Sequence, residues 1–134
     1  MIIAMGLDLH KEKCVAYAKF AGKGEPRPRQ QEFLDRINET FKRFPTDYRG
    51  MTALADFVRD HEVHILVEGS TVTHDVYWML RNLGLDVTAA HAADLFQITK
   101  SVDKTDNNDA MKLAGYMRRK LWGEIEFAEC YIPE

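Results

Sequence analysis

The sequence predicts an α/β domain with a mixed five-stranded sheet, the first strands antiparallel, and helices on both faces. Two apolar runs near the N-terminus are separated only by a short polar turn, which is typical of an antiparallel hairpin. Later apolar runs alternate with helical patterns, which favours parallel strands joined by crossover helices. At 134 residues the chain fits one compact domain, residues 1–134, and shows neither an internal repeat nor a second domain.

The hairpin and a possible third strand occupy the first part of the chain. Ile2–Leu9 is an almost continuous apolar run, and Cys14–Phe20 alternates well enough to be its antiparallel partner. Residues 22–31 are rich in Gly, Pro and charge and predict a loop. The next segment, residues 32–45, is compatible with a short helix, a third strand around Thr40–Phe44, or both.

Helices and strands alternate after Pro45. Thr46 or Asp47 is placed to cap the first of these helices, and Ser70 or Thr71 to cap the second, which Gly84 should terminate. The expected elements are a helix over Met51–Asp60, a strand over Val63–Val67 ending in Glu68, a helix through Leu83, a strand over Leu85–Ala90 and a helix from about Thr105 to Leu121.

Composition narrows the class of protein. No apolar run approaches the roughly twenty residues that span a bilayer, and the apolar start lacks the features of a signal peptide. We therefore expect a cytoplasmic protein with no membrane partner. Cys14 and Cys130 lie far apart without a metal-binding pattern, which favours buried free thiols. The net charge of −3 predicts weak binding of nucleic acid by this chain alone.

Four acidic residues are the candidate functional groups. Asp8 and Glu68 each end an apolar strand, where a charge is costly unless it is solvated, paired or bound to a metal. If the two strands are parallel neighbours, their ends form a crevice at the topological switch point. Asp106 and Asp109 are three residues apart and can project from one face of the last helix. Four converging carboxylates need divalent cations such as Mg²⁺ or Mn²⁺, which points to phosphoryl transfer.

Each acidic residue also has a structural interpretation. Asp106 is a good helix cap and Asp109 is favourable near a helix N-terminus, and for this pair alone we prefer that interpretation. Asp8 could be a turn residue, and Glu68 could cap the following helix or pair with a lysine. These separate interpretations do not explain why two apolar strands expected to be adjacent both end in a carboxylate, and this coincidence favours a site.

Basic side chains near these carboxylates are candidate nucleic-acid contacts. Lys11 and Lys104 lie close in sequence to Asp8 and Asp106 and are placed to contact phosphates. His10 could approach the metals or a phosphate, and a turn histidine satisfied by local hydrogen bonds is an equal alternative.

Three segments carry a recognisable pattern, in order along nearly the whole chain: Gly6–Lys11, Val67–Ser70 with Tyr77, and Lys104–Ala110 with Leu113 and Ala114. Together they resemble the N-terminal domain of the DEDD transposases, the one-ten family of insertion sequences, which includes Piv-type DNA invertases. The resemblance implies a RuvC-like, RNase-H-type fold and a catalytic domain for DNA transposition and recombination. It implies an Asp-Glu-Asp-Asp site for Mg²⁺ or Mn²⁺ at Asp8, Glu68, Asp106 and Asp109.

The resemblance also implies a larger enzyme. Family members carry a C-terminal transposase domain with a nucleophilic serine, so we expect residues 1–134 to be a fragment or a degenerate copy, inactive alone. DNA is the implied partner, some members use an element-encoded guide RNA, and the full-length protein is expected to be a homo-oligomer. The chain departs from the family pattern at Gly69-Ser70, at Ala90-His91 and in the long segment Gly24–Asn38, and retains all four carboxylates.

Other functions remain open from the sequence. A self-sufficient RuvC-like nuclease of the junction-resolvase type would use the same metals with water as the nucleophile. An actin-like or sugar-kinase-like ATP-binding domain has a similar first hairpin, but His10 and Lys11 replace the small residue needed for close phosphate approach. A non-catalytic interaction module of the same fold would bind a partner without metal.

Overall fold

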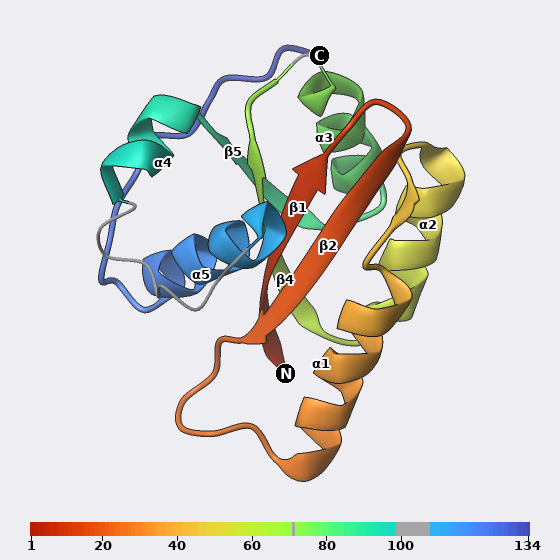
Figure 1. Cartoon of the computed structure of the whole chain (residues 1–134), viewed down its shortest axis with the longest axis vertical. Helices are drawn as coiled ribbons and strands as arrows, with labels where there is room; N and C mark the ends of the chain where they lie inside the picture. The colour runs from red at the N-terminus through yellow and green to blue at the C-terminus, as the bar shows by residue number, and fades with distance from the viewer. Residues whose placement is uncertain (71, 99–107) are drawn as a thin grey trace.

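A mixed five-stranded sheet forms the centre of the computed structural model, which describes residues 1–70, 72–98 and 108–134 (Figure 1). The strands are β1 (Ile2–Leu9), β2 (Lys13–Phe20), β3 (Phe44–Pro45), β4 (Glu62–Glu68) and β5 (Asp86–Ala90). Their order is β3-β2-β1-β4-β5. β2 pairs antiparallel with β1 and β3, whereas β4 pairs parallel with β1 and β5. The predicted α/β class and mixed sheet are confirmed.

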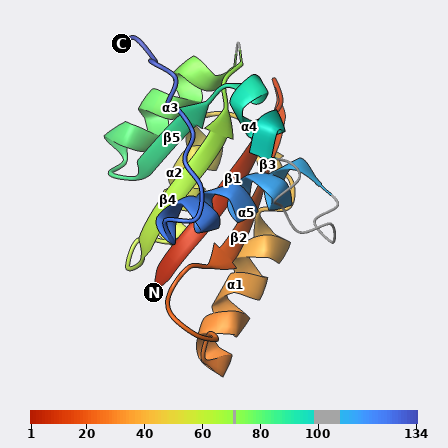
Figure 2. The same cartoon turned by 90° about the vertical axis from the view of Figure 1, so that its left-hand side faces the viewer.

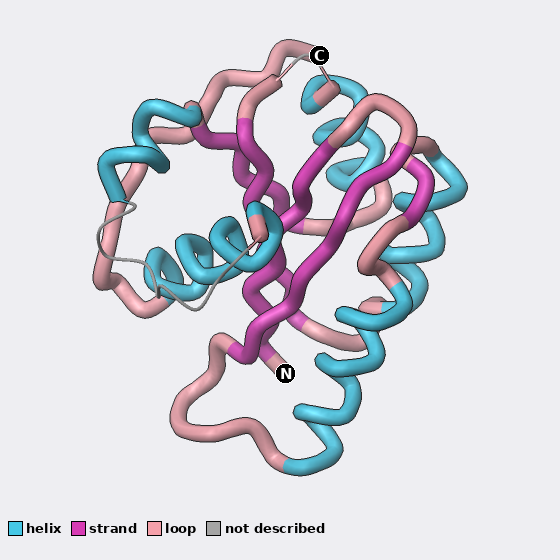
Figure 3. Tube along the Cα trace, viewed as in Figure 1, coloured by secondary structure: helices cyan, strands magenta, loops and turns pink. Residues whose placement is uncertain are grey.

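Helices cover both faces of this sheet, as predicted. They are α1 (Pro28–Thr40), α2 (Tyr48–Phe57), α3 (Thr73–Asn82), α4 (Ala92–Ile98) and α5 (Asp109–Leu121). α1, α2 and α3 contribute to one buried cluster, and α4 and α5 contribute to a second on the opposite face. Figure 2 shows α4 and α5 in front of the sheet, and Figure 3 shows the strands in the middle of the molecule.

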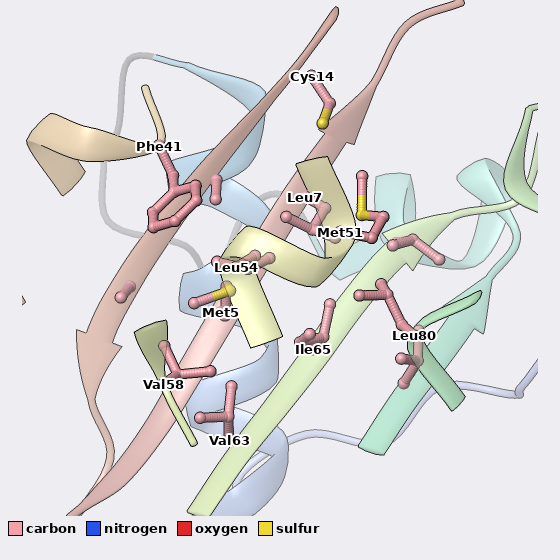
Figure 4. Close-up of a cluster of buried hydrophobic side chains, with 14 of the residues drawn as sticks. Met5, Leu7, Cys14, Phe41, Met51, Leu54, Val58, Val63, Ile65 and Leu80 are labelled. Carbon is pink, nitrogen blue, oxygen red and sulfur yellow. The ribbon is translucent and has the colours of Figure 1, made fainter. Parts of the chain in front are cut away.

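The larger core lies between the sheet and the first three helices. In β1, Ile3, Met5 and Leu7 face this core and are completely buried. Met51 and Leu54 of α2 are also completely buried there (Figure 4). Full burial of such a side chain contributes about 1.5–3 kcal/mol, so this layer is the main source of stability on its face. The alternate residues of β1 are left to face α5.

The segment between β2 and β3 differs from the predicted loop. α1 begins at Pro28, inside the predicted loop of residues 22–31, and ends at Thr40. Proline is favourable in the first turn, where its missing N–H costs no hydrogen bond, and Gln30 Oε1 accepts a hydrogen bond from the Arg27 N–H at 2.8 Å. Leu34 and Ile37 bury the inner face of the helix. A helix and a strand therefore both occur in this segment, but the strand, β3, is Phe44–Pro45 rather than the predicted Thr40–Phe44, because α1 extends to Thr40.

An asparagine protects the exposed edge of β2. β3 pairs with only the first two residues of β2, which leaves the rest of that edge without a neighbouring strand. The Asn38 side chain accepts a hydrogen bond from the Ala18 N–H at 2.7 Å and donates one to the Ala18 carbonyl at 3.2 Å. The Phe41 carbonyl accepts another from the Ala16 N–H at 2.9 Å. The end of α1 thus supplies part of the hydrogen bonding that a longer strand would provide.

The later elements match the prediction except at particular boundaries. Asp47 caps α2 through a hydrogen bond from the Gly50 N–H, as expected, but α2 ends at Phe57 rather than near Asp60. Val72 stands at the N-cap of α3, in place of Ser70 or Thr71, and Thr71 lies outside the described residues. Gly84 ends α3 with a φ of 87°, as predicted. α4 was not predicted, because its seven residues are too few for a clear helical pattern.

A histidine joins β4 to β5 at the end of the sheet opposite the candidate site. His64 Nδ1 lies 2.6 Å from Asp86 Oδ2, and Nε2 lies 2.7 Å from Glu62 Oε2. Both ring nitrogens can donate together only when the ring is protonated. Burial lowers the pKa of His64, but the hydrogen bonds to Glu62 and Asp86 outweigh it and raise the pKa above its usual value. The two carboxylates in the folded structure therefore favour the protonated ring.

Stability should depend on pH through His64. Because the folded pKa is above the unfolded one, the His64 contribution is fully present below the unfolded pKa and is lost as pH rises through the folded pKa. Urea unfolding of the wild type and of His64→Gln should differ by about 1 kcal/mol at about pH 6, and the difference should be smaller at about pH 9. A difference of the same size at both pH values would contradict this assignment.

Both cysteines are free, as predicted. Cys14 is completely buried in the larger core, and this burial raises the pKa of its thiol to about 11. Cys130 is half-buried beside Gly69. A thiol with so high a pKa is almost entirely protonated at neutral pH, so Cys14 is a packing residue. Among the described residues, no helix has the length and apolar character needed to cross a membrane.

Candidate metal site

Asp8 and Glu68 end neighbouring parallel strands. The register of β1 and β4 pairs Leu7 with Val67, the residues immediately before the two carboxylates. Asp8 is half-buried and Glu68 is exposed. The predicted adjacency of these two strand ends is therefore present at the carboxyl edge of the sheet.

The two side chains also belong to the same face of the sheet. Leu7 and Val67 are in the core on the α1–α3 side, and successive side chains of a strand point to opposite faces. The alternation therefore places Asp8 and Glu68 on the face covered by α5. Leu66 and Ala4, two and four residues before them, belong to the cluster on that α5 side. Two independent strands thus direct one carboxylate each to the same side of the sheet.

Gly6 allows α5 to approach this face closely. A Cβ atom at Gly6 would meet the Ala110 carbonyl oxygen and lie 2.6 Å from the Ala114 backbone nitrogen. The first turns of α5 therefore lie directly on β1, two residues from Asp8. α5 begins at Asp109, not near Thr105 as predicted, and the extended residue Asn108, rather than Asp106, caps the helix by accepting a hydrogen bond from the Met111 N–H at 2.7 Å. This packing brings the start of α5 to the carboxyl edge of the sheet.

A cavity of about 240 Å³ connects Glu68 with Asp109. Both carboxylates line it, together with Lys112 and Tyr116 from α5 and Leu95 from α4. Lys112 supplies a cation beside the two acidic groups, which suits a negatively charged ligand bound through a metal. Asp8 is not among the lining residues. α5 and α4 therefore form one wall of a partly open space whose floor is the end of β4.

Asp8 has a local partner instead. Its Oδ2 lies 3.1 Å from Nε2 of His10, whose side chain is 68% exposed. An exposed pair of this kind contributes at most about 1 kcal/mol and is easily exchanged for another ligand. The structure thus shows His10 at the site edge with a local hydrogen bond, which is the structural alternative considered from the sequence. Lys11 is exposed in the same turn.

The hydroxyl of Thr73 fixes the end of β4. It donates to the Glu68 carbonyl oxygen at 2.7 Å and accepts from the Ser70 N–H at 2.9 Å. Thr73 is almost fully buried, so these bonds are shielded from water. The Gly69 N–H also donates to the Ala90 carbonyl at 2.8 Å. The backbone that carries Glu68 is therefore held on two sides.

Two predicted residues, Asp106 and Lys104, lie outside the described residues. Within the described ranges, no group of three or more His, Cys, Asp or Glu side chains is arranged to hold a metal ion. The chemistry of the donors fits a hard divalent cation, since Asp8, Glu68 and Asp109 all offer carboxylate oxygens. Mg²⁺ characteristically keeps several waters and binds through one or two carboxylates plus substrate phosphates. The residues present therefore fit a site completed by water and substrate.

Two residues that line the cavity, Leu95 and Tyr116, were not predicted from the sequence. Leu95 lies on α4, a helix that was not predicted. Tyr116 shares a helical face with Asp109 and Lys112, at spacings of three and four residues, and this spacing is the signal that would have found it. Comparison with models of known protein families and with curated proteins finds no match for this chain.

Proposed function

We propose that this chain is the metal-binding catalytic domain of a DNA transposase or site-specific recombinase of the DEDD type, acting in the cytoplasm. The observation that carries the proposal is that Asp8 and Glu68 end adjacent parallel strands on one sheet face, where α5 brings Asp109 to a shared cavity with Glu68. A mixed sheet with antiparallel first strands and helices on both faces supports a RuvC-like, RNase-H-type fold. The resemblance of the sequence around these carboxylates to the DEDD transposases is the reason for proposing that family.

In this function, the protein positions a DNA phosphodiester at the carboxyl edge of the sheet. Asp8, Glu68 and Asp109 would hold Mg²⁺ or Mn²⁺ together with Asp106, which lies outside the described residues. The bound ions would supply Lewis-acid activation of the phosphodiester and stabilise the leaving oxygen. Lys112 lines the same cavity and would offset the charge of a phosphate there. Strand exchange would require the second domain that the family resemblance implies.

Calorimetric titration with Mn²⁺ tests the proposal directly. The wild-type chain should bind Mn²⁺ in the micromolar to millimolar range, and the Glu68→Gln, Asp109→Asn double variant should lose this binding because two oxygen ligands become neutral amides. Titrations should be run with and without a short DNA duplex, since a substrate phosphate is expected to complete the coordination.

A matched variant separates site effects from a general change in charge. Asp35→Asn with Glu39→Gln removes the same two charges from exposed positions on α1, on the opposite face of the sheet. This control should bind Mn²⁺ as the wild type does. Equal binding by the Glu68, Asp109 variant and the wild type, or no binding by the wild type even with DNA, would contradict the metal site.

A further inference from the structure

The turn between β1 and β2 is joined to the connection between β3 and α2, although the two are more than thirty residues apart in the sequence. Lys13 pairs with Pro45 in the antiparallel register of β2 and β3. The Thr46 N–H donates to the Glu12 carbonyl oxygen at 2.9 Å. Figure 1 shows this turn beside the start of α2, at the top of the view. The two segments therefore lie side by side.

Four exposed cations lie in or within a few residues of these joined segments, and we call them the basic rim: Lys11, Lys13, Arg43 and Arg49. Two carboxylates lie among them, Glu12 and Asp47, and Asp47 is 3.8 Å from Arg49. Within the described residues, Lys11, Lys13 and Arg43 have no carboxylate within ion-pair distance. The rim is therefore a local excess of positive charge in a chain whose net charge is −3.

Lys13 connects the rim with the sheet face that carries the candidate metal site. The antiparallel register places Val15 opposite Asp8, and Lys13 is two residues further along β2. The alternation of side chains therefore puts Lys13 on the same sheet face as Asp8 and Glu68. A polyanion bound at Lys13 would therefore lie on the sheet face of the two carboxylates.

An exposed aromatic ring lies next to one of the rim cations. Tyr48, the first residue of α2, is 60% exposed and precedes Arg49. Cations interleaved with an aromatic ring are the combination that binds nucleic-acid backbones and stacks unpaired bases. An acidic peptide would satisfy the cations but would not place a phosphodiester at the carboxylates. The chemistry beside the rim thus favours DNA as its occupant.

We infer that the basic rim binds the phosphodiester backbone of a DNA strand and holds it against the carboxylate site. The inference rests on the proposed function, and it names the surface that positions the substrate. Lys13 and Arg43 are its central pair, since they lie on either side of the β2–β3 contact. The negative charge elsewhere on the chain would repel DNA from other faces and so orient the strand on the rim.

Fluorescence anisotropy with labelled duplex and single-stranded oligonucleotides, in EDTA and over a series of KCl concentrations, tests the rim without metal. The Lys13→Gln, Arg43→Gln double variant should bind duplex about tenfold or more weakly near about 0.1 M salt. Its slope of log affinity against log salt should be shallower by about 1.8, because about two phosphate contacts are lost. The Lys13→Arg, Arg43→Lys variant keeps both charges and should bind as the wild type does.

A matched control removes two cations from the other end of β2. Lys23 and Arg29 are exposed in and after the loop that follows β2, and Figure 1 shows this loop at the bottom of the molecule. Lys23→Gln with Arg29→Gln should leave both the affinity and the salt slope unchanged. Equal losses in this control and in the rim variant, or no DNA binding by the wild type, would overturn the inference.

Mn²⁺ calorimetry on the same variants separates this inference from the proposed function. The rim variant should bind Mn²⁺ as the wild type does, because all carboxylates remain. If the rim variant binds DNA as the wild type does, and Mn²⁺ binding is intact, the inference about the rim is wrong and the metal site is unaffected. If the wild type does not bind Mn²⁺, but its DNA binding is weakened in the rim variant, the metal site is wrong and the rim is supported.

Discussion

Replacement of Asp8 by asparagine is expected to abolish the stabilisation of this fold by Mn²⁺. A ligand that binds only the folded state stabilises it by about 2.7 kcal/mol at one hundred times its dissociation constant, which corresponds to a rise in Tm on the order of 10 °C for a domain of this size. Asp8→Asn replaces a charged carboxylate ligand at the end of β1 with a neutral amide, which binds a divalent cation more weakly. Thermal unfolding followed by circular dichroism, with and without Mn²⁺, measures the change.

A second aspartate provides the comparison. Asp56 also has a single close cationic partner, Arg59 at 2.7 Å, but it lies on α2, away from the carboxyl edge of the sheet. Asp56→Asn should keep the full Mn²⁺-induced rise in Tm. A Mn²⁺-induced rise in Tm of wild-type size in Asp8→Asn would show that the bound metal does not use the carboxylate at the end of β1.

Gly6→Ala is expected to destabilise the protein by about 3 kcal/mol, a large effect for a single methyl group. The new Cβ would meet backbone atoms of Ala110 and Ala114, and backbone cannot rotate away as the end of a side chain can. α5 would have to move off β1, which separates the inner face of the helix from Ala4 and Leu66. Urea unfolding measures the loss, and a weaker Mn²⁺ affinity should accompany it because Asp109 moves with the helix.

The same substitution at another glycine shows whether the close approach is the cause. A Cβ at Gly69 would lie 3.1 Å from Cys130 Sγ and 3.6 Å from the Ala90 carbonyl, and a cysteine side chain can adjust by a few tenths of an ångström. Gly69→Ala should therefore cost much less than Gly6→Ala. Equal stability of Gly6→Ala and wild type, within about 0.5 kcal/mol, would be incompatible with the packing of α5 on β1.

Local sequence patterns predicted the parts of the fold that carry Asp8 and Glu68. β1 matches the predicted range Ile2–Leu9, and the β1–β2 hairpin has the predicted antiparallel pairing. β4 ends at Glu68, as the apolar run before it indicated. These elements were predictable because an apolar run with a charged end specifies both a buried strand and its exposed terminus without reference to other segments.

The segment from α1 to β3 depended on tertiary contacts. Gly, Pro and charge at residues 22–31 predicted a loop, but burial of Leu34 and Ile37 supports a helix that begins at Pro28. β3 can be short because the Asn38 side chain forms hydrogen bonds with the β2 backbone that a longer strand would otherwise form. Pro28 in the first turn is a local signal for the helix start, whereas the pairing of Asn38 with β2 does not follow from local propensity, because it depends on which surface the segment covers.

The sequence by itself determined which residues end the central strands and which chemistry they carry, since charge at the end of an apolar strand is a local property. Only the tertiary structure decided what lies beside them. Close packing at Gly6 brings α5 to the face that carries Asp8 and Glu68, and pairing of Lys13 with Pro45 brings Arg43 to the same edge. The physical reason is that strand register and helix docking are set by burial between segments distant in the chain, which no local pattern specifies.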